Sequence, residues 1–328
     1  MTDAPFGRLL TAMVTPMTPD GAVDSAGIGR VVEHLLASGH DGIVVNGTTG
    51  ESSTLTTQES IDVVRQVVER VDGRAHVVAG AGSNDTAHAV HLATEMAAVG
   101  ATGLLVVTPY YNRPPQRGLL AHFRAVADAT DLPVCLYDIP GRCGIPIETD
   151  TLIALAEHPR IVAVKDAKAD LFAATKVMAA TDLAWYSGDD VLVLPHIAQG
   201  AVGLIGVTTH LAGQKYAALI DAALAGRRQE AIALNRELIA VADAVMNTSQ
   251  GAIMAKAGLV ELGVIEHATV RLPLVESTPE HLEKLRAGLA ASGRESSPRI
   301  PTSRCRRHSL TTVCGSCRSV DSVRSGAT

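Results

Sequence analysis

The sequence predicts an α/β protein, a (β/α)8 TIM barrel with a C-terminal helical extension. Three observations predict it: short apolar runs recur along the chain, amphipathic segments separate them, and polar residues gather where the apolar runs end. Strands buried on both faces of a parallel sheet are continuous apolar runs rather than alternating ones. About eight strand–helix units are present, the number that closes such a barrel.

The predicted strands are short and rich in Val, Ile and Leu. They are residues 9–15, 42–45, 75–79, 103–108, 133–137, 161–165, 184–187 and 203–207. Helical segments between them include residues 25–38, 57–71, 85–99 and 116–130. Ser25, Thr57 and Asp85 are the expected helix N-caps, because their side-chain oxygens can accept from the first free backbone N–H groups.

An open, doubly wound parallel sheet is the competing arrangement. Polar residues follow many different strands in this chain, and a barrel brings all those strand ends to one mouth, whereas an open sheet spreads them along a line. The barrel is therefore favoured. We assign residues 1–224 to it and residues 225–292 to the extension, whose predicted helices are 227–245, 251–259 and 279–290.

Residues 293–328 form a basic, cysteine-containing tail that we expect to be disordered. This tail contains seven arginines and two acidic residues, Glu295 and Asp321, so its net charge is +5. Because the whole chain has a net charge of −6, the preceding body carries −11. Cys305, His308, Cys314 and Cys317 would suffice for one zinc ion. An unstructured extension is the favoured interpretation, and deleting residues 295–328 should leave activity and oligomer size unchanged.

Composition excludes several classes of protein. With 47% hydrophobic residues among 328, the chain can build a large core and is not a disordered protein. Aromatic residues make up only 3%, which disfavours a nucleic-acid binder based on stacking. The net charge of −6 gives no general attraction to anionic lipid or phosphate, and no apolar run reaches the roughly 20 residues of a membrane span. Neither a membrane nor a nucleic-acid partner is expected, and without a visible signal peptide the expected location is cytoplasmic.

The second strand is followed by NGTTGES, residues 46–52. Glycines on both sides of two threonines allow backbone N–H groups and hydroxyls to face a small anion such as a carboxylate. A tight turn that caps the next helix is an equal alternative. The chain has neither of the glycine-rich patterns typical of nucleotide phosphate sites, so such a ligand is not expected.

Tyrosines follow the fourth and fifth strands. Tyr110 and Tyr111 lie on a proline-rich loop, and for Tyr110 packing or an interface contact is the favoured role. Tyr137 ends the fifth strand, where a phenol can carry a proton. Arg142 comes five residues later, and its planar guanidinium suits a carboxylate.

The sixth strand ends with Lys165 after four apolar residues. A lysine at that place would point into the barrel mouth, where burial disfavours its charged form and frees the amine to attack a ketone. A surface lysine that reaches solvent is the alternative. The seventh strand ends in SGDD, residues 187–190, where Asp190 is expected to cap the next helix. Schiff-base chemistry requires neither metal nor other cofactor, and we expect none.

These segments together resemble the dihydrodipicolinate synthase (4-hydroxy-tetrahydrodipicolinate synthase) family, in an actinobacterial-like form. The matching motifs are GTTGES at 47–52, TPYYNRP at 108–114, YDIPGR at 137–142, VKDA at 164–167 and SGDD at 187–190. The resemblance implies that Lys165 forms a Schiff base with pyruvate and that Tyr137 is the general acid and base. It implies that Thr48 links Tyr137 to Tyr111, which reaches in from a neighbouring subunit. Arg142 would hold the carboxylate of the second substrate.

The resemblance also implies the partners of the protein. They are pyruvate and L-aspartate-4-semialdehyde, condensed in the diaminopimelate and lysine pathway by a homotetramer built from tight dimers. Thr49 would bind the pyruvate carboxylate with the loop N–H groups. Gly188 and the carbonyl of Ile205 would line the pocket.

Many members of this family are inhibited by lysine. Thr57 and Ser60 stand where lysine-sensitive bacterial members carry histidines, and His88 stands where they carry a glutamate that pairs with an amino group of the lysine. Weak or absent inhibition is therefore expected. The positions that agree with an allosteric lysine site are Ser52, Ser53, Asn84 and Tyr110.

Two alternatives to the synthase activity are open at this stage. N-acetylneuraminate lyases and 2-keto-3-deoxy sugar-acid aldolases share the lysine and tyrosine but generally lack an arginine at the position of Arg142. A non-catalytic ligand-binding paralogue would have lost the lysine or a tyrosine, and neither is lost here.

Overall fold

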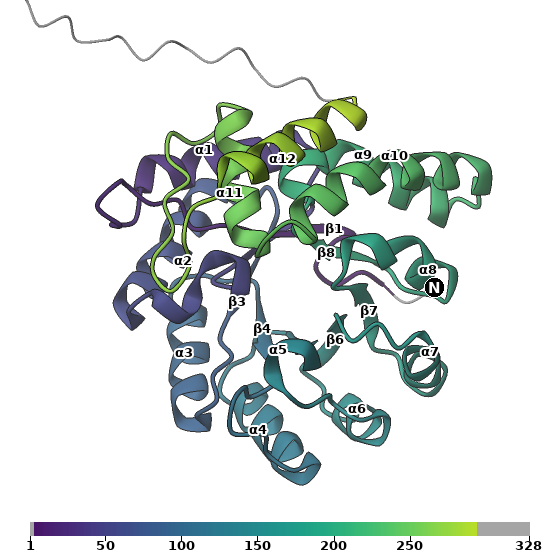
Figure 1. Ribbon diagram of the computed structural model, residues 1–328. Helices are drawn as coiled ribbons and strands as arrows, with labels where there is room; N and C mark the ends of the chain where they lie inside the picture. Colours follow the sequence, from purple (N-terminus) through teal and green to yellow (C-terminus); the bar gives the residue numbers. More distant parts are fainter. Residues whose placement is uncertain (1–2, 294–328) are drawn as a thin grey trace, which may run out of the picture. The chain divides into compact units, whose positions relative to one another are not determined.

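The computed structural model describes residues 3–293, which form a closed barrel of eight parallel strands (Figure 1). Each strand pairs with the next along the chain, and the eighth pairs back with the first. The barrel prediction is thereby confirmed. The strands are β1 (Leu9–Ala12), β2 (Gly42–Val45), β3 (His76–Gly80), β4 (Gly103–Val107), β5 (Val134–Asp138), β6 (Ile161–Asp166), β7 (Ala184–Ser187) and β8 (Gly203–Gly206).

Helices follow the strands and surround the barrel (Figure 1). They are α1 (Ser25–Ala37), α2 (Thr57–Val71), α3 (Thr86–Ala98), α4 (Gln116–Asp128), α5 (Pro140–Cys143), α6 (Thr149–Ala156), α7 (Leu171–Ala180), α8 (Val193–Ala198) and α9 (Thr209–Leu224). Three short 3₁₀ turns lie at strand ends: η1 (Thr48–Gly50), η2 (Ser52–Thr54) and η3 (Asp190–Leu192).

Side chains alternate between two apolar cores along each strand. Cys135 and Ala163 belong to the small cluster inside the barrel, whereas Leu136 and Val164 belong to the large cluster between strands and helices. Because successive side chains of a strand point to opposite faces, Lys165 must point inward, two residues after Ala163. Tyr137 is itself a member of the inner cluster.

Two of the three predicted N-caps are wrong by one residue. Asp24 caps α1 instead of Ser25 and accepts from the Gly27 N–H at 2.9 Å. Thr56 caps α2 instead of Thr57, in a reciprocal capping box with Glu59. In both cases the N-cap is followed by a second residue whose side chain could also cap the helix. The N-cap is the residue with an extended backbone, and the sequence does not show which of the two residues that is. Asp85 caps α3 as predicted.

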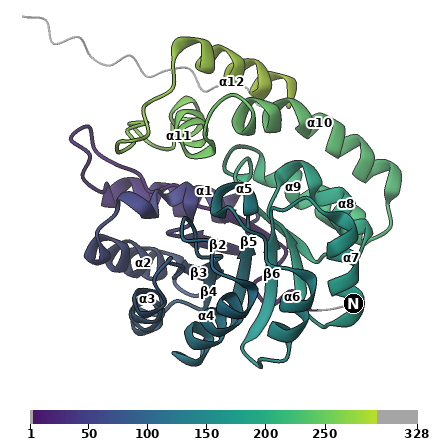
Figure 2. The same cartoon turned by 60° about the horizontal axis from the view of Figure 1, so that its bottom comes forward.

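Three helices follow the barrel: α10 (Arg228–Met246), α11 (Gly251–Glu261) and α12 (Pro279–Ala291). They lie together beside α1 and α9 in both views (Figures 1 and 2), and α11 packs against η1. The division of the body after residue 224 stays a prediction. The predicted tail and its four candidate zinc ligands lie outside the described residues.

No single helix within residues 3–293 is both long and apolar enough to cross a membrane. Helices α10 and α11 meet that test only when counted together, across a bend of 113°.

Candidate active site

Lys165 lies near the carboxyl end of β6 and is 3% exposed. In the sheet it is in register with Tyr137 of β5 on one side and Tyr186 of β7 on the other. Its Nζ lies 4.3 Å from the centre of the Tyr137 ring. Burial lowers the pKa of Lys165 to about 8, so a useful fraction of the amine is neutral near physiological pH.

Asp190 is the buried carboxylate whose charge partly offsets this shift, because it raises the pKa of Lys165. Its oxygens accept from the N–H groups of Val207 and Thr208 at 2.9–3.1 Å, at the end of β8. Burial raises the pKa of Asp190 to about 6. The expectation that Asp190 caps a helix is wrong: Asp189 caps η3. Only the fold shows which of two adjacent acids turns inward.

Tyr137 is 6% exposed, and burial raises the pKa of its phenol well above the ordinary value. A hydrogen bond to the Thr48 side chain and the charge of Arg142 act in the opposite direction. The phenol therefore keeps its proton at neutral pH and is able to donate it to an oxygen atom that gains negative charge.

Tyr137, Thr48 and Arg142 line one cavity of about 360 Å³. Arg142 is exposed and belongs to the short helix α5, directly after β5. Residues predicted for the allosteric site line the same cavity: Ser52, Ser53, His88 and Tyr110. The structure thus brings members of both predicted groups to one connected space, although Lys165 is not among the residues that line it.

Other predicted residues lie near the strand ends but do not line this cavity. Thr49 is 6% exposed in η1, and Ile205 is fully buried inside the barrel. The Gly188 N–H donates to the carbonyl of Asp166 at 2.7 Å, and a side chain at Gly188 would come within 2.9 Å of that backbone. Gly188 therefore allows the chain after β7 to approach the Asp166 backbone closely. The substrate contacts of Thr49, Ile205 and Gly188 stay predictions.

The loop after β4 carries Tyr111, which is 89% exposed and does not line the cavity. Its φ of +73° is uncommon for any residue but glycine. Asn84 is half-buried and also outside the cavity lining, and its carbonyl accepts from the Asn112 side chain at 2.8 Å. A single chain does not assemble the predicted Thr48–Tyr137–Tyr111 relay.

Asn46 is a cavity-lining residue that the sequence analysis missed. It has a φ of +56°, and its side-chain amide donates to the Ser60 carbonyl at 2.8 Å. Its position just before the GTTGES motif, where a left-handed asparagine is a common turn residue, was the available signal. Within residues 3–293, no group of three or more His, Cys, Asp or Glu side chains is arranged to hold a metal ion.

A closed parallel barrel with a buried lysine of lowered pKa, next to a tyrosine at the carboxyl ends of the strands, defines a lyase of the class I aldolase type. The chain belongs to the dihydrodipicolinate synthetase family, whose model matches residues 5–292. The resemblance stated from the sequence motifs is thereby confirmed.

Individual relatives agree with the family. The chain is 53% identical over 289 residues to 4-hydroxy-tetrahydrodipicolinate synthase 2 of Streptomyces coelicolor, covering 88% of this chain and 96% of that protein. Among solved structures, it is similar to the lysine-bound dihydrodipicolinate synthase of Cyanidioschyzon merolae, with a TM-score of 0.86, 40% identity and coverage of 89% and 99%. It is also similar to the pyruvate complex of a chloride-inhibited enzyme from Acinetobacter baumannii, with a TM-score of 0.85, 36% identity and coverage of 88% and 99%.

Proposed function

We propose that this chain condenses pyruvate with L-aspartate-4-semialdehyde to 4-hydroxy-tetrahydrodipicolinate through a Schiff base on Lys165. The observation that carries the proposal is the buried amine of Lys165, with a pKa of about 8 and the Tyr137 ring 4.3 Å away. The names of the relatives and the presence of Arg142 favour this activity over a sugar-acid aldolase. The presence of Lys165 and Tyr137 disfavours a non-catalytic paralogue.

In the first half-reaction, the neutral amine of Lys165 attacks C2 of pyruvate. The carbonyl oxygen takes a proton from the Tyr137 hydroxyl, and the phenolate takes one back from the attacking nitrogen to give the carbinolamine. Tyr137 then protonates the departing hydroxyl group, and loss of water gives the protonated imine. Thr49, with the loop N–H groups, would hold the pyruvate carboxylate. The carbonyl of Ile205 and the backbone of Gly188 would bound the pocket.

In the second half-reaction, the Tyr137 phenolate takes a proton from C3 of the bound pyruvate, which gives an enamine and restores the phenol. C3 then forms the new carbon–carbon bond with the aldehyde carbon of the semialdehyde, whose oxygen takes a proton from Tyr137. Arg142 would orient this substrate by its carboxylate. Attack of the substrate amino group on the imine carbon closes the ring and returns the free amine of Lys165.

We further propose that the enzyme is a homotetramer of tight dimers and works in the cytosol, where amino-acid biosynthesis takes place. The exposure of Tyr111 and its backbone strain support the first part of this proposal. In a tight dimer, Tyr111 would reach the Thr48 hydroxyl of a second copy and complete a relay to Tyr137.

Reduction with borohydride in the presence of pyruvate tests the proposal. We expect a covalent adduct on Lys165, loss of activity, and no adduct in Lys165→Ala. Lys168 is the matched control, because it lies three residues away and pairs with Asp138 at 3.2 Å; Lys168→Ala should still form the adduct. An adduct on any lysine but Lys165 would overturn the assignment. Turnover with aspartate semialdehyde, but not with sugar aldehydes, separates the synthase from the other aldolases.

A further inference from the structure

The loop proposed to bind the pyruvate carboxylate begins and ends at residues in the left-handed region, and the second of them, Glu51, is strained there. Asn46 and Glu51 both have a φ of +56°, which L-residues other than asparagine and aspartate rarely adopt. Such conformations persist only where surrounding contacts impose them, and they gather at functional sites. The Asn46 side chain donates to Ser60 of α2, as described above. The contacts that hold Glu51 come from a different part of the molecule.

Both oxygens of the Glu51 carboxylate are bound by the C-terminal extension. Lys256 of α11 donates to one oxygen with 2.5 Å between Nζ and Oε1, and the Arg271 backbone N–H donates to the other at 2.9 Å. Lys256 is fully buried and donates also to the Thr269 carbonyl at 2.6 Å. The side chain of Glu51 is 1% exposed. The strained end of the loop is therefore fixed by a charged contact that is closed to solvent.

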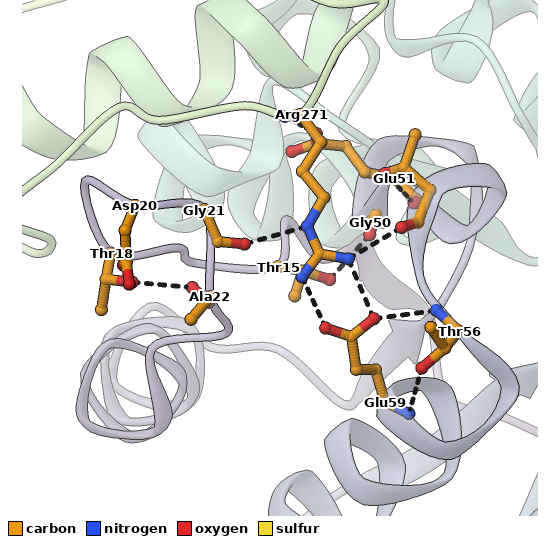
Figure 3. A network of polar contacts seen from close by, with 11 residues as sticks. Thr15, Thr18, Asp20, Gly21, Ala22, Gly50, Glu51, Thr56, Glu59 and Arg271 are labelled. Atoms are coloured by element: carbon orange, nitrogen blue, oxygen red, sulfur yellow. Dashed lines mark hydrogen bonds and ion pairs between the residues drawn. The ribbon is translucent and has the colours of Figure 1, made fainter.

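The Arg271 side chain adds a second connection, shown in Figure 3. Its guanidinium forms a two-pronged pair with Glu59 in the first turn of α2 and donates to the carbonyls of Thr54 and Gly21 at 2.7 and 2.9 Å. Glu59 in turn closes the capping box of α2. Glu51, Glu59, Lys256 and Arg271 are here called the Glu51 network.

The Glu51 network balances two carboxylates against two cations, and none of its four members lines the cavity. It borders η1, the segment that carries Thr48 and Thr49, against which α11 packs. Removing one partner of a buried ion pair leaves the other charge without compensation, so the strained conformation at Glu51 would lose its support. The network contacts the loop directly at Glu51, and it contacts the cavity wall through the start of α2 at Glu59.

We propose that Glu51, Lys256 and Arg271 are positioning residues that hold residues 47–50 in the conformation that binds the pyruvate carboxylate. The extension, which supplies none of the predicted catalytic residues, thereby sets the affinity for the first substrate. This inference rests on the proposed function. A preorganised loop loses no freedom when the anion binds, and a loosened loop must be ordered at the expense of affinity.

The test is the steady-state kinetics of Lys256→Met, which removes the charge and keeps much of the stem. We expect the KM for pyruvate to rise by about tenfold or more, equivalent to about 1.4 kcal/mol of binding free energy. The KM for the semialdehyde and kcat should change by much less. Arg286→Ala is the matched control, because Arg286 forms a two-pronged pair with Glu261 in the same extension. It should leave both KM values unchanged.

Two further variants keep the test decisive if Lys256→Met folds poorly. Glu51→Gln keeps the side-chain shape but places an amide N–H₂ against one of two donors, and it should raise the KM for pyruvate in the same way. Arg271→Met retains the backbone N–H bond to Glu51, so its effect should have the same direction and be smaller. Hydrogen exchange of the peptide containing residues 47–52 should become faster in each of these variants, and unchanged in Arg286→Ala.

The outcomes separate the two proposals. If the wild-type protein forms no pyruvate adduct on Lys165, the proposed function fails. If the wild type forms the adduct and these variants keep the wild-type KM for pyruvate, or lose only kcat, the positioning role of the Glu51 network is overturned while the proposed function stands.

Discussion

At the scale of single residues, the strand register and burial decide the reactivity of Lys165. Its amine sits inside the barrel because Ala163, two residues earlier, also faces the interior. Burial lowers the pKa of the amine, the charge of Asp190 raises it, and the charge of Arg142 lowers it. Reactivity thus depends on residues from three strand ends rather than on the lysine alone.

This balance predicts the pH dependence of the first half-reaction. The rate of imine formation should rise with pH through about 8, because the protonated amine below its pKa cannot attack pyruvate. Single-turnover trapping with borohydride, from about two pH units below this value to about two above it, gives the profile. A rate that does not change over this range would contradict the assigned pKa.

Arg142→Ala should impair use of the semialdehyde more than imine formation with pyruvate. A charge-assisted contact of this kind is worth roughly 1.5–3 kcal/mol, which corresponds to a loss of about tenfold to a hundredfold or more. Because Arg142 also lowers the pKa of Lys165, the pH profile should move to higher pH in the variant. Arg142→Lys is the control that keeps the charge without the planar fork. Equal damage to both half-reactions would make the role of Arg142 structural.

At the scale of elements, η2, α2 and α3 bring the predicted lysine-site residues to the wall of the cavity. Ser52, Thr57 and His88 are among the lining residues. We predict weak or absent inhibition by lysine, because an imidazole at position 88 replaces a carboxylate that would pair with the ammonium of lysine. A lost charged hydrogen bond costs roughly 1.5–3 kcal/mol, which moves an inhibition constant about tenfold to a hundredfold.

Initial rates at saturating substrates, titrated with lysine, measure this inhibition. Half-inhibition at submillimolar lysine would refute the prediction. A response that appears in His88→Glu would support the mechanism, and Thr57→His is a second substitution at a departing position on the cavity wall.

Elements were predictable because their signals are local. The apolar run 161–164 predicts a buried strand by itself, and the two-residue period of a strand then predicts the direction of the Lys165 side chain. Choices between neighbours were not predictable. Both members of each neighbouring pair, Asp24 and Ser25, Thr56 and Thr57, and Asp189 and Asp190, are able to cap a helix, and backbone conformation selects one of them.

At the scale of the whole molecule, the sequence did not predict which side chains far apart in the chain pair with each other. Glu51 and Lys256 are 205 residues apart, and no local pattern connects a glutamate after a glycine loop with a lysine in an apolar helix. The closed barrel brings them together, because η1 follows β2 at the mouth and α11 packs against it.

The same long-range packing buries two histidines in neutral form and predicts acid sensitivity. His210 accepts from the Val14 N–H at 3.1 Å and donates through its other ring nitrogen to the Val207 carbonyl at 2.7 Å. His40 is bound by Thr11 and by the Leu35 carbonyl. Burial lowers the pKa of His210 to about 3 and that of His40 to about 4. Neither ring can gain a proton without losing a contact or placing a charge in the core.

Because the unfolded chain binds these protons at its ordinary pKa of about 6.5, it takes up more protons than the folded state as the pH falls below that value. The free energy of unfolding should be at its full value above this pH and should decrease toward pH 4. At about two pH units below 6.5, each histidine should account for a loss of about 2–3 kcal/mol. Urea unfolding at a series of pH values measures this slope. His40→Gln should reduce it, whereas His91→Gln, an exposed position on α3, should not. An identical slope in wild type and His40→Gln would show that other groups cause the loss of stability in acid.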